Sequence, residues 1–136
     1  MMEVQVEHLG AVQFEIKARQ HVIVSDQPPE NFGHDEGMTP PELLLASLGS
    51  CAAFYAAAYL RKYKLSEKGV KVRVTAEKLK DPPRVGAFRI FVDAPVPLDP
   101  SHTEGMMRSV HQCLIHNTLL QPPTIAIEIH NPALAV

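Results

Sequence analysis

Residues 39–63 read TPPELLLASLGSCAAFYAAAYLRKY and begin with a strong helix start. Thr39 and Glu42 have the spacing of a capping box, and Pro40 and Pro41 fit the first turn of a helix. The basic residues at the other end of the stretch favour the C-terminal end of the helix dipole. We therefore expect a helix of about 24 residues, roughly 36 Å long, that ends within residues 64–69.

Residues 43–60 carry no charged side chain, and this run of 18 residues lies at the lower edge of a membrane-spanning length. Its Ala, Ser and Gly content makes transfer into lipid only weakly favourable, so we expect a buried helix and no membrane insertion. A chain this small can hardly bury such a helix on every face. The sequence therefore predicts a partner subunit that covers the second face.

Alternating apolar and polar residues on both sides of this helix predict β-strands. Before the helix the alternation covers 3–7, 12–17 and 21–25, and a polar, Pro- and Gly-rich loop covers 26–38. After the helix it covers 70–76, 87–94 and 124–129. A second helix is expected from residue 99, with Ser101 and Glu104 as a second capping box and Met106, Val110, Cys113 and Leu114 on one face. This order is typical of an α+β fold.

The composition of the 136 residues fits one soluble globular domain over 1–136. A hydrophobic content of 46% and a net charge of -2 exclude a disordered chain, and the scattered Lys and Arg argue against a nucleic-acid-binding face. The first residues show neither a basic segment nor an apolar run, so no secretory signal is expected. We therefore predict a cytoplasmic protein with reduced thiols.

Cys51 and Cys113 could carry chemistry, and the residues alone leave two interpretations open. Both could be buried side chains that act as small hydrophobic groups. Alternatively, helix packing could bring them together, so that one thiolate attacks an oxidant and the other resolves the sulfenic acid as a disulfide. Neither a CxxC motif nor a recognised metal-ligand spacing is present. Because burial alone would raise the pKa of Cys51, we expect a cation to activate it, from the arginines Arg19, Arg61, Arg84, Arg89 and Arg108.

Two blocks of sequence carry a resemblance to a known family. Residues 37–51 read GMTPPELLLASLGSC, and residues 113–120 read CLIHNTLL and are followed by two prolines. Both resemble the cysteine helices of the OsmC/Ohr family (osmotically inducible protein C and organic hydroperoxide resistance protein), in the same order and spacing. The resemblance spans nearly the whole chain and is nearer to the OsmC-like branch. It implies an OsmC-like intertwined homodimer, with two main helices wrapped by antiparallel sheets and active sites at the subunit interface.

The same resemblance implies a thiol-dependent peroxidase that reduces organic hydroperoxides to alcohols in preference to hydrogen peroxide. It assigns the peroxidatic thiol to Cys51 and the resolving thiol to Cys113, joined by a disulfide after turnover. The implied reductant is a dithiol, a role that lipoyl groups serve in the Ohr branch. No metal, haem or flavin cofactor is implied.

Active family members also use an Arg and a Glu to activate the peroxidatic Cys. Arg19 is the one arginine before Cys51 and takes the first role. The family's Glu lies ten residues before that Cys, where this chain has Pro41, so Glu42, nine residues before, takes the second. Nine residues of helix turn about 900°, so Glu42 would act only through a bend or on the partner subunit. The alternative is an OsmC-fold protein that binds a small apolar molecule and whose thiols are incidental.

Overall fold

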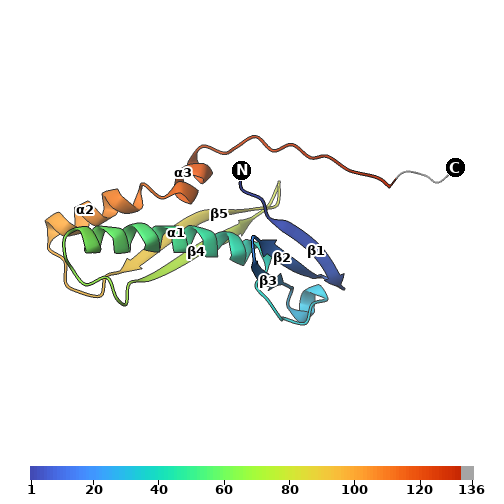
Figure 1. The fold of residues 1–136 in the computed structure, drawn as a ribbon, viewed down its shortest axis with the longest axis horizontal. Helices are drawn as coiled ribbons and strands as arrows, with labels where there is room; N and C mark the ends of the chain where they lie inside the picture. Colours follow the sequence, from blue (N-terminus) through green and yellow to red (C-terminus); the bar gives the residue numbers. More distant parts are fainter. Residues whose placement is uncertain (133–136) are drawn as a thin grey trace.

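The computed structural model describes residues 1–132, which form two antiparallel sheets and three α-helices (Figure 1). The first sheet contains, in spatial order, β1 (Gln5–Gly10), β2 (Gln13–Ala18) and β3 (His21–Ser25). The second sheet contains β4 (Lys71–Leu79) and β5 (Arg84–Asp93). The helices are α1 (Pro40–Lys62), α2 (Pro100–Val110) and α3 (Leu114–Leu120), and a short 3₁₀ turn covers Pro29–Asn31. The predicted α+β class is confirmed.

The long helix α1 begins at the predicted capping box. The Glu42 backbone N–H donates to the Thr39 hydroxyl oxygen at 3.4 Å, and the Thr39 backbone N–H donates to the Glu42 carboxylate at 3.0 Å. The helix has 23 residues and ends at Lys62, within one residue of the expected length. Within residues 1–132 it is the one helix whose length and composition would allow it to cross a membrane.

The core of the chain forms where α1 contacts both α2 and the β4–β5 sheet (Figure 1). Met106 of α2 is buried against this face of α1. The hydroxyl of Tyr59 on α1 lies 2.8 Å from Nδ1 of His102 on α2, so a polar contact also joins the two helices. The buried side chains of α1 are Leu48, Ala52, Ala56, Tyr59 and Leu60.

The β1–β3 sheet lies beyond the N-terminal end of α1, and no other layer of the described chain covers it (Figure 1). Every residue of β1 is exposed, and Val6 and Ile23 keep 60% and 48% of their surface in solvent. The three predicted strands are confirmed. We expected one face of this sheet to be buried in a core, but within one chain no other element packs on it.

The C-terminal part of the chain differs from the sequence prediction in its helices. The predicted second helix is interrupted at residues 111–113 and becomes α2 and α3. Asp99 caps α2 by accepting from the His102 backbone N–H at 2.8 Å, so the predicted capping box of Ser101 and Glu104 is wrong. The aspartate is the better-placed cap because Pro100 then occupies the first helical position.

The predicted strand over residues 124–129 is also wrong for the single chain. These residues are exposed throughout and extend away from the helices (Figure 1). A strand requires a neighbour whose backbone groups complete its ladder, and none lies beside this segment in the described chain.

Candidate active site

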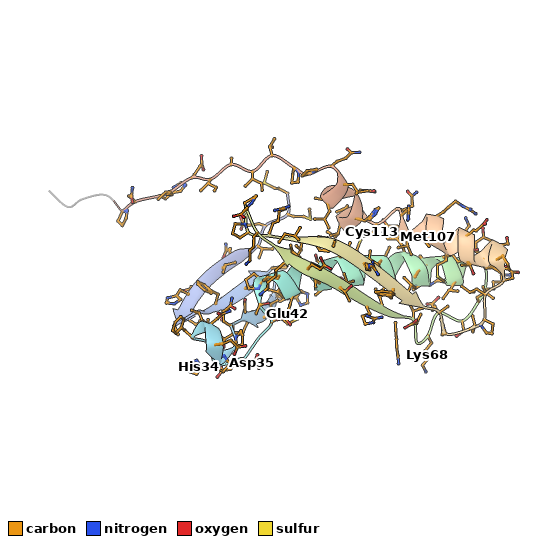
Figure 2. The ribbon with its side chains drawn as sticks, turned by 180° about the vertical axis from the view of Figure 1, so that it is seen from behind. His34, Asp35, Glu42, Lys68, Met107 and Cys113 are labelled. Carbon is orange, nitrogen blue, oxygen red and sulfur yellow. The ribbon has the colours of Figure 1, made fainter. Side chains whose placement is uncertain are left out.

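Cys51 and Cys113 lie together where α1 passes the start of α3. Cys51 occupies the middle of α1 and is half-buried, whereas Cys113 is the N-cap residue of α3 and is fully buried. Both thiols are free, and the Cys113 thiol donates a hydrogen bond to Cys51. Figure 2 labels Cys113 at the start of α3 and Met107 on α2, the preceding helix. Helix packing therefore brings together two cysteines that are distant in the sequence.

The two thiols have opposite shifts in pKa. Burial raises the pKa of Cys51, but hydrogen bonds from the Cys113 thiol and from the backbone N–H groups of Ile115 and Leu114 outweigh burial. The net pKa of Cys51 is therefore below its ordinary value of 9.0. Burial raises the pKa of Cys113, and its hydrogen bond to Cys51 raises it further. Because the thiolate is the nucleophilic form, Cys51 is the thiol of this pair that is suited to attack.

The backbone groups that lower the pKa of Cys51 were missed by sequence reasoning. The break at residues 111–113 turns the first N–H groups of α3 toward the thiol on α1. The expected cation is not found, because no Arg or Lys in residues 1–132 contributes to the pKa shift of Cys51. The one signal in the sequence is Cys113 itself, whose sulfur caps α3 by accepting from the His116 backbone N–H at 3.4 Å.

Arg19 and Glu42, the two other predicted site residues, do not contact Cys51 within the described chain. Arg19 occupies the β2–β3 turn with a φ of 56° and an exposed side chain. The Glu42 carboxylate accepts from the backbone N–H of Thr39 and from its hydroxyl, at 3.0 and 2.8 Å, and these bonds lower its pKa. Glu42 is thus a helix-capping residue in one chain. A role for either residue at Cys51 would require a second copy.

A cavity of about 610 Å³ opens between β5 and the α2–α3 segment. It reaches Leu48, one turn before Cys51 on α1, and His116, one turn after Cys113. Met106 and Met107 contribute to a lining that is largely aliphatic and aromatic. The arrangement places an apolar space one helical turn from each thiol. Residues 1–132 contain no group of three or more His, Cys, Asp or Glu side chains placed to hold a metal ion.

Comparisons with solved structures identify the fold. A Psychrobacter arcticus protein described in terms of osmotic stress and detoxification matches with a TM-score of 0.79, 24% identity and coverage of 87% of this chain and 88% of that one. An OsmC-like protein from Mycoplasma pneumoniae matches with a TM-score of 0.77 and 16% identity, over 90% of this chain and 89% of that one. The organic hydroperoxide resistance protein OhrB of Bacillus subtilis matches with a TM-score of 0.62 and 14% identity, over 87% of this chain and 89% of that one. At these identities the likeness establishes the fold.

Comparison with protein families identifies the chain more closely. No curated protein matches it in sequence. The model of the family described as OsmC-like protein matches residues 33–128, a span that contains both thiols and the whole of α1, α2 and α3. Because this match covers more than half of the chain, the chain belongs to the OsmC-like protein family.

Proposed function

We propose that the protein is a cysteine-based peroxidase that reduces organic hydroperoxides to alcohols. The observation that carries the proposal is the contact between Cys51 and Cys113, in which one thiol has a lowered pKa and the other a raised one. The chain belongs to the OsmC-like protein family, and its structural neighbours include organic hydroperoxide resistance proteins. Both findings support a redox role in peroxide stress. The peroxidatic residue in this proposal is Cys51, and the resolving residue is Cys113.

The reaction has two steps on the protein. The Cys51 thiolate attacks the terminal oxygen of the hydroperoxide, the O–O bond breaks, and the alkoxide leaves as the alcohol after taking up a proton. Cys51 is then a sulfenic acid, and Cys113 displaces its hydroxyl as water to form the disulfide. A dithiol, such as a lipoyl group, restores both thiols by exchange. The apolar cavity beside the thiols would hold the organic part of the substrate.

The proposed enzyme is a cytoplasmic homodimer. Apolar side chains on β1 and β3 and on residues 125–129 remain exposed in one chain, which supports a second copy that covers them. In such a dimer Arg19 from one subunit would stabilise the Cys51 thiolate and the leaving alkoxide of the other. Glu42 could contribute only if the partner subunit brings it to the site, since it caps α1 in its own chain.

The test is hydroperoxide consumption by purified variants with excess dithiol. Cys51→Ser should abolish consumption of cumene hydroperoxide, because it removes the nucleophile. In a parallel assay without dithiol, Cys113→Ser should consume one equivalent per subunit and leave a sulfenic acid that a dimedone probe traps. Arg19→Ala should slow the first step, with Arg89→Ala as the matched control on an exposed arginine of β5. Unchanged consumption in Cys51→Ser would rule out the peroxidase.

A second candidate function is suggested by the cavity and by the missing cation at Cys51. An OsmC-fold binding protein would hold a small apolar molecule in this space without using its thiols. After treatment with an organic hydroperoxide it would keep both thiols free. The peroxidase would instead lose both thiols to one disulfide.

A further inference from the structure

His116 is linked to Cys113 through its backbone, and its ring packs against His111. His116 is the third residue of α3, and its backbone N–H donates to Cys113 Sγ at 3.4 Å. A helical side chain leans toward the N-terminus and covers the preceding turn. The His116 ring does so here, because it packs against the ring of His111, on the other side of Cys113 in the chain, with centroids 5.3 Å apart and planes 36° apart.

One nitrogen of this ring is buried without a partner. Nδ1 of His116 has almost no solvent-accessible surface, and no hydrogen-bond partner for it exists in residues 1–132. It is the one such side-chain atom in the described chain. Buried polar atoms nearly always have partners, so an exception calls for an explanation. An unpaired lone pair costs less than an unpaired N–H, which favours the proton on Nε2 and leaves Nδ1 as an empty acceptor.

The surroundings of the His116 ring contain few other groups that could exchange a proton. The ring of His111 packs against it at a tilt, and Cys113, which accepts from the His116 backbone N–H, interacts in turn with the Cys51 thiol on α1. The side chains of β5, α1 and α2 that line the adjoining cavity include no carboxylate, lysine or arginine. An imidazole is therefore the base that this part of the chain offers.

The resolving step needs such a base. Cys113 is fully buried, and in the reduced protein its thiol hydrogen is donated to Cys51. Once Cys51 carries a hydroxyl on sulfur, that acceptor is lost and the Cys113 proton must leave before its sulfur can attack. Bulk water does not reach a thiol with no exposed surface.

We propose that Nδ1 of His116 accepts the thiol proton of Cys113 when the Cys51–Cys113 disulfide forms. This inference rests on the proposed peroxidase function. The Cys113 S–H bond breaks as the proton moves to Nδ1, the sulfur–sulfur bond forms, and the S–O bond of the sulfenic acid breaks. The expelled hydroxide takes back the proton from His116 and leaves as water. Cys51 sulfur is reduced and Cys113 sulfur is oxidised by the same electron pair.

The first experiment separates the two chemical steps in the full-length protein. Reduced wild type, His116→Phe and the matched control His111→Phe are mixed with stoichiometric cumene hydroperoxide, quenched, and analysed for sulfenic acid and disulfide by mass spectrometry. His116→Phe should form sulfenic acid at the wild-type rate but form the disulfide on the order of 100-fold more slowly. His111→Phe keeps the base and should form the disulfide at close to the wild-type rate. A wild-type disulfide rate in His116→Phe would overturn the proposal.

The pH profile of the disulfide step separates a proton acceptor from a packing residue. The wild-type rate should rise less steeply with pH than the rate of the variant that lacks the imidazole. The His116→Phe rate should keep rising about tenfold per pH unit, because only the thiolate fraction of Cys113 then reacts. Parallel profiles for the two proteins would contradict the proposal. His116→Asn, which keeps a polar group but no base, should behave like His116→Phe and serves if the phenylalanine variant does not fold.

A second arm does not depend on peroxide chemistry. A small aromatic disulfide places a mixed disulfide on Cys51, and attack by Cys113 then releases a second coloured thiolate. His116→Phe should slow this release while the first release is unchanged, and equal second release in variant and wild type would overturn the role of His116. If no variant forms sulfenic acid with hydroperoxide, the peroxidase proposal fails while this arm still decides the role of His116.

Discussion

The β4–β5 hairpin and the β1–β3 sheet carry the same alternating pattern of apolar residues, but they are covered to different extents. Val72 and Val74 on β4 are half-buried because α1 packs on that sheet. Val4 and Val6 at the start of the chain keep 58% and 60% of their surface in solvent. The difference shows that alternation determines which side chains share a face, whereas another element must supply the layer that covers it.

The segment after α3 belongs with the uncovered region. Ile125, Ile127 and Ile129 are 83%, 84% and 83% exposed and project on alternate residues, as on one face of a strand. The same chain therefore has an apolar sheet face that nothing covers, on β1–β3, and an apolar strand pattern that pairs with no sheet, in residues 125–129. A second copy that exchanges these parts would satisfy both, so the uncovered region is the part whose state should depend on dimerisation.

The largest effect is expected when the apolar face of the C-terminal segment is removed. Changing Ile125, Ile127 and Ile129 together to serine should shift the proposed dimer to monomers. Each buried isoleucine contributes about 1.5–3 kcal/mol, so the loss exceeds what most dimers tolerate. Sedimentation velocity over a range of protein concentrations measures the change.

The matched control for this variant alters the alternate residues of the same segment. Thr124→Ser, Ala126→Ser and Glu128→Gln together should leave the dimer intact, because these side chains lie on the opposite face of an extended strand. An equal loss of dimer in both triple variants would mean that side-chain burial on one face is not what holds the copies together.

A substitution in the covered region should lower stability directly. Leu60 has no exposed surface, and Leu60→Ala should lower the free energy of unfolding by about 2–5 kcal/mol, as measured by urea denaturation. Ile23→Ala in β3 is the comparison, since Ile23 is exposed in one chain. In the dimer Ile23→Ala should also destabilise, and its effect should depend on protein concentration. A concentration-independent loss for Ile23→Ala would argue against a covered sheet.

A smaller effect is expected at the junction between the two regions, where α1 begins. Thr39→Ala removes the hydroxyl that caps the helix and should cost about 1 kcal/mol of unfolding free energy. Ser66→Ala, at an exposed position after the helix, is the control and should change little. Thermal unfolding followed by circular dichroism compares the two variants. If both behave like wild type, the capping box does not stabilise the helix start.

The smallest effect concerns the loop that connects the regions. The pKa of Asp26 lies below its ordinary value of 3.8 because its carboxylate accepts from the backbone N–H of Gln27 at 2.7 Å, with further bonds from Glu36, Gln13 and His34. Its stabilisation is therefore present above pH 3.8 and is lost as the pH falls through the lower, folded-state value. Asp26→Asn should be less stable than wild type near neutral pH and should show a flatter loss of stability in acid. Urea unfolding of wild type and Asp26→Asn from neutral to acid pH measures this difference. An equal loss of stability in the two proteins as the pH falls would contradict the role given to Asp26.

The parts of the fold that follow local rules were predictable from the sequence. The start of α1 follows from the capping geometry of Thr39 and Glu42, and its length follows from the uncharged run. The five strands β1 to β5 follow from alternation, but alternation also predicted a strand over residues 124–129 that the single chain does not form. The break between α2 and α3 was not predictable, because neither Gly nor Pro marks residues 111–113 and Cys113 is an unusual capping residue.

The candidate site was predictable in its residue types but not in its geometry. The sequence indicated two thiols that could meet, yet their contact depends on the packing of α1 against α3. The means of lowering the Cys51 pKa was expected to be a cation. It is instead a neighbouring thiol and two backbone N–H groups, which no residue type in the sequence encodes.

The most direct test of the account is a disulfide map of the reduced protein after treatment with one equivalent of cumene hydroperoxide, with hydrogen peroxide in parallel. We predict a fast disulfide between Cys51 and Cys113 of the same chain, formed more quickly with the organic hydroperoxide. Two free thiols after exposure to either oxidant would contradict the account, because a contacting thiol pair with a lowered pKa at Cys51 would then have no peroxidase chemistry.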